Sequence, residues 1–233
     1  MQSPFREFRD GLRDIAPAMI AAIPIGLLFG ALCAGKGLSP AEVALMGALV
    51  FAGGAQFAAV EIWRAPAPIT VLAFSTLLIN LRHVLMGASL APKMRGFTPL
   101  QRALSVYVMA DENWAMSERR ALERPLTVAY FAGTAILFWL NWVMSTTLGA
   151  LGGSLMGDPK RLGADFAFTA LFIGLVAGFW KGRATAVTVA ASALASAAVY
   201  VSAGPPWHVA AGALAGIAAA YAMGGHQHGE AAR

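Results

Sequence analysis

Seven long apolar runs constrain this chain more than any other feature of its sequence. They cover residues 15–33, 41–60, 68–92, 126–152, 164–180, 185–203 and 206–224. Each approaches the roughly 20 residues that a helix needs to cross a hydrocarbon core. Of the 29 charged residues (17 Lys and Arg plus 12 Asp and Glu), only Glu42, Arg82 and Asp165 fall inside the runs. This pattern excludes a soluble domain and predicts one all-α membrane domain, a polytopic transmembrane helical bundle of about seven spans.

The composition agrees with this prediction. Hydrophobic residues make up 58% of the chain and charged residues 12%, whereas soluble domains carry about 25% charged residues. In a multi-pass protein, a net charge of +5 reports basic loops on the cytoplasmic side rather than affinity for nucleic acid. The single Cys33 excludes an intrachain disulfide. We therefore expect a multi-pass protein of the inner cell membrane, in contact with the lipid bilayer.

The N-terminal segment 3–14 has an amphipathic pattern. Its apolar positions are Phe5, Phe8 and Leu12, and its basic positions are Arg6, Arg9 and Arg13. Both sets recur at spacings of three and four, which favours a helix lying in the headgroup layer, although a solvated helix has the same pattern. Beyond it we expect a first helical half at 15–92, a connection at 93–125, further helices at 126–224 and a flexible tail at 225–233.

The basic residues give conflicting indications of topology. The connection 93–125 is rich in Lys and Arg, and three predicted spans separate it from the basic N-terminus, so the two cannot both be cytoplasmic. Either the N-terminus lies outside, or the segment 99–117 crosses or re-enters the membrane. We favour the second solution, which gives eight spans if the segment crosses.

A short internal similarity indicates a repeat of three-helix units. Residues 25–30 read IGLLFG and residues 173–178 read IGLVAG. Transporters often contain such related halves, but Gly- and Ala-rich helices also resemble one another by chance. The GxxxG pairs, such as Gly26–Gly30 and Gly149–Gly153, predict close helix packing in either case.

The first polar cluster at membrane depth is FAGGAQF, residues 51–57. Consecutive glycines weaken a helix, and unwinding at Gly53–Gly54 would free backbone groups that are tolerated only where they are buried in protein or line a cavity. Gln56 adds an acceptor and two donors. The cluster fits a site for the main-chain groups of an amino acid, and simple helix packing is the alternative.

The second cluster is Asn80, Arg82 and His83. Asn80 and His83 share a helix face with Thr76 and Gly87, which gives a polar stripe suited to lining a substrate path. Arg82 points elsewhere and requires an acidic partner or the headgroup layer. A helix end in the headgroups is the alternative interpretation.

The third cluster is the neighbouring pair Asp111 and Glu112. Adjacent carboxylates disfavour double ionisation, which suits proton uptake and release, and one of them is a candidate partner for Arg82. A solvated acidic loop is the alternative. The histidines of the tail, His226 and His228, are too few for a metal site, and Asp165 fits a helix cap. The sequence contains no motif of an enzyme or of a cofactor site, so we expect no enzyme, cofactor or metal.

Five stretches, in this order, resemble the AzlC family of branched-chain amino-acid permeases. They are PIGLLFG (24–30), FAGGAQF (51–57), NLRHVLMGASLAP (80–92), ADENWAM (110–116) and GADFAFTALFIGL (163–175). The resemblance covers nearly the whole chain, and the NLRH and GGAQF stretches are its more specific parts. It implies the large subunit of a two-component exporter of leucine, isoleucine, valine and related substrates such as methionine, working with a small hydrophobic AzlD-type subunit.

These observations predict a secondary transporter driven by the proton gradient. The first cluster would hold the main-chain groups of the substrate, the second would line the path, and Arg82 would pair with Asp111 or Glu112 and exchange partners between states. Two other classes remain open at this point. One is a channel-like pore for small solutes, and the other is a structural or regulatory subunit of a membrane complex.

Overall fold

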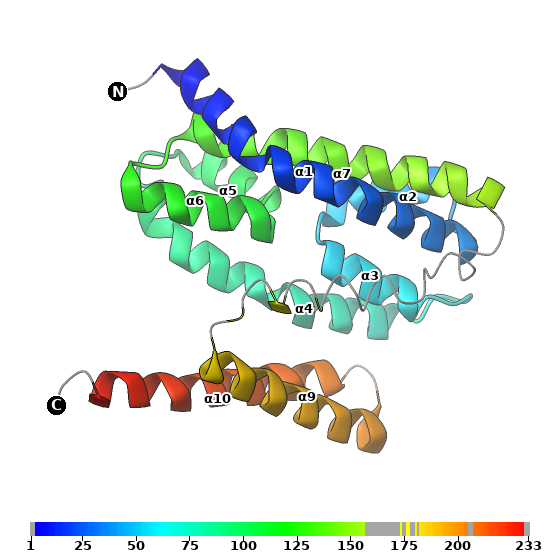
Figure 1. The fold of residues 1–233 in the computed structure, drawn as a ribbon. Helices are drawn as coiled ribbons and strands as arrows, with labels where there is room; N and C mark the ends of the chain where they lie inside the picture. Colours follow the sequence, from blue (N-terminus) through cyan, green and yellow to red (C-terminus); the bar gives the residue numbers. More distant parts are fainter. Residues whose placement is uncertain are drawn as a thin grey trace. The chain divides into compact units, whose positions relative to one another are not determined.

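The structure is a computed structural model that describes residues 3–156, 182–204 and 207–230, with the isolated positions 173, 176, 177 and 180. All regular elements in this part of the chain are helical, which confirms the all-α class (Figure 1). The chain divides into two compact units. Unit 1 contains Met1–Arg64 and Asn80–Ala167, and unit 2 contains Ala65–Ile79 and Phe168–Arg233.

Two long parallel helices form the frame of unit 1. Helix α1 spans Pro4–Gly35 and α7 spans Val128–Met156. Their parallel course follows from the contacts, because Gly11 meets Tyr130 and Gly30 meets Thr146. Residues 4–14 are thus the first three turns of α1 rather than a separate helix. A helix of 32 residues is about 48 Å long, which exceeds the hydrocarbon core of about 30 Å.

Glycines allow the backbones of α1 and α7 to touch. A Cβ atom added at Gly26 or Gly30 would overlap Ser145 or the Thr146 carbonyl, and one added at Gly149 would overlap the Leu27 carbonyl. Two of the GxxxG pairs therefore face each other across one interface. Close approach of this kind is how helices associate in lipid, where burying apolar side chains gives little advantage.

Residues 41–60 do not form the single span that their length predicts. Helix α2 covers Pro40–Val50, the chain breaks at Phe51–Ala52, and α3 covers Gly53–Glu61. The Lys36 side chain, at the end of α1, donates hydrogen bonds to the carbonyls of Glu61 and Trp63. Since α3 ends where α2 began, the two form a hairpin that enters beside α7 and returns to the same end of unit 1.

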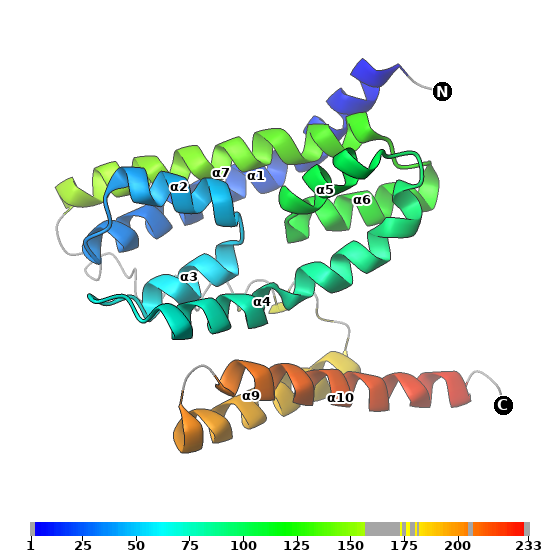
Figure 2. The same cartoon turned by 180° about the vertical axis from the view of Figure 1, so that it is seen from behind.

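A second hairpin enters from the opposite end. Helix α4 (Ile69–Leu90) and the 3-10 turn η1 (Ala91–Met94) lead to α5 (Pro99–Tyr107), and α6 (Asp111–Glu123) turns back. Near the end of α6, Arg120 bonds to Glu7 in the first turn of α1. The predicted segment 99–117 is therefore a broken pair of helices, and Figures 1 and 2 show the two hairpins along opposite halves of the α1–α7 pair.

The two hairpins begin in the same way. Ser39 caps α2 in a reciprocal capping box with Glu42, and Thr98 caps α5 in one with Gln101. In both, proline occupies the first helical position, where a missing N–H costs nothing. The hairpins thus start from equivalent signals at opposite ends of the unit.

The arrangement within unit 1 bears on the conflict over topology. Within unit 1, α2 and α3 return to the end at which α1 finishes, whereas Arg120 of α6 contacts Glu7 at the end where α1 begins. The basic N-terminus and the basic connection then lie at the same end. Residues 41–60 have the length and hydropathy of one span, but the structure divides them into the two short helices α2 and α3.

Unit 2 contains an antiparallel helix pair and the first half of α4. Helix α9 (Arg183–Ala203) and α10 (Trp207–Glu230) pack through small residues, and Gly212 lies against Ser192 and Ser196. Over the described residues, four helices are long and apolar enough to cross a membrane, namely α1, α4 with η1, α7 and α9. The predicted span 164–180, with Asp165 and the 173–178 repeat, lies almost entirely outside the described residues.

Candidate functional site

The break in the first hairpin is held open by side chains. Phe51 has φ +40°, a left-handed conformation that is unfavourable for a bulky residue. In a continuous helix the Ala52 N–H would bond to the Ala48 carbonyl. Instead, the Ala52 N–H donates to Gln56 Oε1 at 3.3 Å. The Ala48 carbonyl accepts from Trp139 Nε1 at 3.1 Å and from the Tyr107 hydroxyl. Both halves of one lost helical bond are therefore replaced.

Gln56 is fully buried at this break. Its Oε1 also accepts from Trp142 Nε1 at 2.9 Å, whereas its Nε2 has no partner in the described part of the chain. A buried donor without a partner costs about 1–3 kcal/mol, so Gln56 Nε2 lacks a hydrogen-bond acceptor that would stabilise the protein. The unwinding predicted at Gly53–Gly54 lies instead at Phe51–Ala52, and Gly53 and Gly54 form the first turn of α3.

Aromatic rings surround the break. The ring centroids of Phe29 and Phe57 are 5.2 Å apart, and those of Phe29 and Trp142 are 6.1 Å apart. A Cβ atom at Gly53 would lie 3.4 Å from the Trp142 ring. The surroundings of Gln56 are therefore largely aromatic.

The side chain of Asn113 stabilises the break in the second hairpin through hydrogen bonds to the backbone. This residue is fully buried, its Oδ1 accepts from the Ala110 N–H at 2.9 Å, and its Nδ2 donates to the Val108 carbonyl at 2.7 Å. One amide thus serves backbone groups on both sides of the break. Asn113 is not among the site residues that the sequence predicts, because its backbone partners meet it only in the folded hairpin.

The polar face of α4 contacts the tip of this second hairpin. Arg82 Nη1 lies 2.5 Å from Asp111 Oδ2, and His83 Nε2 lies 3.2 Å from the Met109 carbonyl. A bond to a carbonyl requires the proton on Nε2, which leaves Nδ1 of a neutral His83 as an acceptor. That Nδ1 and Asn80 Oδ1 are buried atoms without a partner among the described residues.

The structure thus brings most of the predicted residues to two neighbouring tips. The Tyr107 hydroxyl bonds to the Ala48 carbonyl, so the end of α5 reaches the last turn of α2. Gly53, Gly54 and Gln56 belong to the first tip. The second tip carries Asp111 and Glu112, with the α4 side chains Asn80, Arg82 and His83 beside it.

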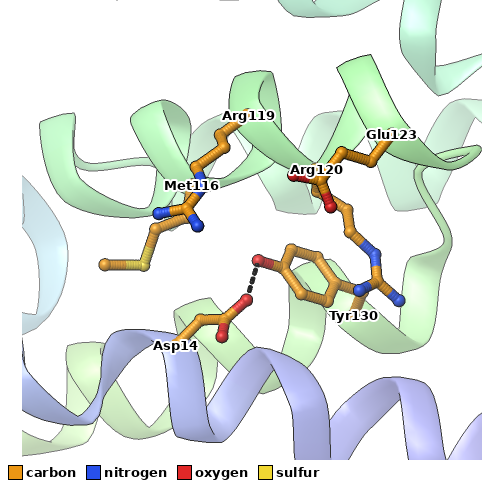
Figure 3. A pocket seen from close by; sticks show the side chains of 6 residues that line it. All are labelled: Asp14, Met116, Arg119, Arg120, Glu123 and Tyr130. Carbon is orange, nitrogen blue, oxygen red and sulfur yellow. Dashed lines mark hydrogen bonds between the residues drawn. The ribbon is translucent and has the colours of Figure 1, made fainter.

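Another polar cluster, here called the Glu7–Arg120 cluster, joins α1, α6 and α7 and was not predicted from the sequence. Arg120 Nη2 lies 2.9 Å from both carboxylate oxygens of Glu7, and Thr127 donates to Glu7 at 3.1 Å. The Tyr130 hydroxyl donates to Asp14 at 2.7 Å (Figure 3). More than a hundred residues separate these partners along the chain, so no local pattern identifies them.

The Glu7–Arg120 cluster lies at a small polar cavity. The cavity has a volume of about 270 Å³ and is lined by Asp14, Met116, Arg119, Arg120, Glu123 and Tyr130. The Arg120 guanidinium also lies over the Tyr130 ring, 4.6 Å from its centroid. The contacts tie the end of α6 to the N-terminal turns of α1.

Among the described residues, no group of three or more His, Cys, Asp or Glu side chains is placed so that it could bind a metal ion. The side chains of His226 and His228 lie outside what the structure describes.

Comparisons with known proteins agree on one family. The family model described as AzlC protein matches residues 17–156. The inner membrane protein YgaZ of Escherichia coli is 30% identical over 190 residues, which cover 78% of each chain. The branched-chain amino acid transport protein AzlC of Bacillus subtilis is 27% identical over 175 residues, covering 74% of this chain and 68% of the relative. No solved structure matches. The chain is a membrane protein of the AzlC family.

Proposed function

We propose that this protein is a secondary transporter that exports branched-chain L-amino acids from the cell. The observation that carries the proposal is the pair of broken hairpins, which enter unit 1 from opposite ends and meet at tips lined with polar groups. Non-helical backbone at membrane depth is tolerated only in protein or at a cavity, and broken helices of this kind bind substrates in transporters. The printed name of the Bacillus relative supports the substrate class.

The first tip is the proposed site for the main-chain groups of the substrate. Gln56 and the backbone of Gly53 and Gly54 supply hydrogen-bonding groups, and the rings of Phe29 and Trp142 provide an apolar wall for a branched side chain. Asn80 and His83 would line the path beyond it, because each has a buried polar atom with no described partner.

The second tip is the proposed site of proton coupling. Glu112 lies on α6, outside the four candidate spans. Burial, and to a smaller extent the Asp111 charge, raises the pKa of the Glu112 carboxyl above its ordinary value, while its own backbone N–H and Arg82 act in the opposite direction. Arg82 would exchange Asp111 for Glu112 as the protein changes state. Proton release would then accompany movement of the second hairpin.

Orientation and partner complete the proposal. The N-terminus and the two ends of the connection, Lys93 and Arg124, lie at one end of unit 1, and their basic residues favour a cytoplasmic location for that end. A small AzlD-type membrane subunit is the proposed partner, consistent with the apolar faces that the described helices expose.

Counterflow of labelled leucine in proteoliposomes tests the proposal. The chain alone and the chain with its small subunit should be compared, with the folded state confirmed by size-exclusion chromatography. Saturable counterflow is the expected result. Flux that neither saturates nor shows counterflow would identify a pore, and no flux from either preparation would contradict transport of leucine. Export and proton coupling are tested by imposing a pH gradient of either sign on the same vesicles.

A further inference from the structure

The two hairpin tips differ in the charge that they can accept. Both place the N-terminus of a helix at the break, where the first N–H groups lack helical partners and favour an anion. The first turn of α6 carries Asp111 and Glu112, whereas the first turn of α3 has no acidic residue and no side-chain cap. The second N-terminus is therefore already neutralised, and the first is open to a negative charge.

A buried donor independently indicates a missing hydrogen-bond acceptor at the first tip, and a carboxylate can supply one. Gln56 Oε1 accepts from the Ala52 N–H, so its amide group lies at the N-cap of α3. Its Nε2 is buried and has no partner among the described residues. A carboxylate placed there would accept from Nε2 and from the backbone N–H groups of Gly53 and Gly54 together. Hydrogen bonds to a charged acceptor are about twice as strong as those between neutral groups.

We infer that the N-terminus of α3 with Gln56 Nε2 binds the carboxylate of the ligand, and that the ligand class is the branched-chain monocarboxylates, including 2-oxo acids that lack the amino group. The inference rests on the proposed function and adds the recognised group and its position. The surroundings of Gln56 contain aromatic rings and the donor Trp142 Nε1, which already bonds to Oε1, and these favour an apolar body with one anionic end.

Competition by leucine analogues tests this inference on the unaltered protein. Leucine counterflow should be measured against 4-methyl-2-oxopentanoate, leucinamide and 3-methylbutan-1-amine. The oxo acid should compete within about tenfold of leucine. The two compounds without a carboxylate should compete at least about tenfold more weakly than the oxo acid, as expected for the loss of a charged hydrogen-bond acceptor. Competition by leucinamide as strong as that by leucine, or none by the oxo acid, would overturn the inference.

A pair of matched variants locates the effect. Gln56→Glu keeps the acceptor and replaces the donor with a negative charge, so it should weaken competition by the oxo acid at least about tenfold. Gln101→Glu makes the same change in the exposed capping box of α5 and should leave the competition pattern unaltered. If Gln56→Glu does not fold, the analogue series still decides. Absence of leucine counterflow in the unaltered protein would refute the proposed function instead, so the two failures are distinguishable.

Discussion

The two hairpins are both broken beside a buried amide side chain, but the surroundings of the two breaks differ. Each break is served by a fully buried amide, Gln56 in the first and Asn113 in the second. The Asn113 amide bonds to backbone on both sides of its break, whereas Gln56 leaves a donor without a described partner. The first break is uncharged and aromatic, and the second lies beside the Arg82–Asp111 ion pair. This difference is the basis for proposing substrate binding at the first break and proton coupling at the second.

The largest expected effect separates these two roles. Gln56→Leu removes the donor and should reduce leucine counterflow about 10- to 100-fold, because bonds to a charged group are worth about 1.5–3 kcal/mol. It also removes the acceptor of the Ala52 N–H and of Trp142 Nε1, so the protein should lose stability as well. Transport is the quantity to measure, with thermal unfolding in detergent as the control for folding. Gln56→Leu transport within threefold of the unaltered protein would contradict a binding role for the first break.

Asn113→Leu should act mainly on stability. It leaves the Ala110 N–H and the Val108 carbonyl without their bonds, and two buried groups cost about 1–3 kcal/mol each when unsatisfied. We expect a lower thermal midpoint and a nearly unchanged affinity for leucine in the protein that remains folded. An unchanged midpoint, with affinity reduced as in Gln56→Leu, would remove the distinction between the two breaks.

The ion pair at the second tip should show coupling between its partners. Arg82→Gln leaves Asp111 without its cation, and the pair is partly exposed, so we expect a moderate loss of stability of about 1 kcal/mol. Adding Asp111→Asn should recover most of this loss. Both variants are compared in a double-mutant cycle by thermal unfolding, and strictly additive losses would show that the contact contributes nothing.

The smallest effect concerns pH. The pKa of Glu112 is raised in the folded protein, chiefly by burial, so the folded state holds this proton more tightly than the unfolded chain does. The resulting stabilisation is present below the unfolded pKa and is lost as pH rises through the folded pKa. Glu112→Gln should therefore flatten the dependence of the unfolding midpoint on pH across that range. An unaltered slope would assign the dependence to other groups.

The sequence predicts much of the fold because lipid imposes simple rules. Apolar length located α1, α4, α7 and α9, and the GxxxG pairs marked the surfaces by which α1 and α7 meet. The glycines at 53–54 indicated a break close to the one that the structure has. Its position is shifted because Phe51 and Ala52 adopt the non-helical conformations, while Gly53 opens the next helix.

What the sequence could not predict depends on contacts between distant segments. The hairpin of α2 and α3 has the hydropathy of a span, and its return depends on partners from other helices, such as Tyr107 and Trp139 on the Ala48 carbonyl. Asn113 can form its hydrogen bonds to the backbone on both sides of the break only when the second hairpin is folded. The Glu7–Arg120 contact joins segments 113 residues apart. Helical periodicity carries no information on such pairs.

The most direct test of the account is the sidedness of the two hairpins in the membrane. In a Cys33→Ser background, single cysteines at Ser39, Trp63, Thr98 and Glu123 are labelled with a membrane-impermeant maleimide from either side of oriented vesicles. The account predicts that positions 39 and 63 react from one side and positions 98 and 123 from the other. Reaction of positions 39 and 63 from opposite sides would show that residues 41–60 cross the membrane and would contradict the account.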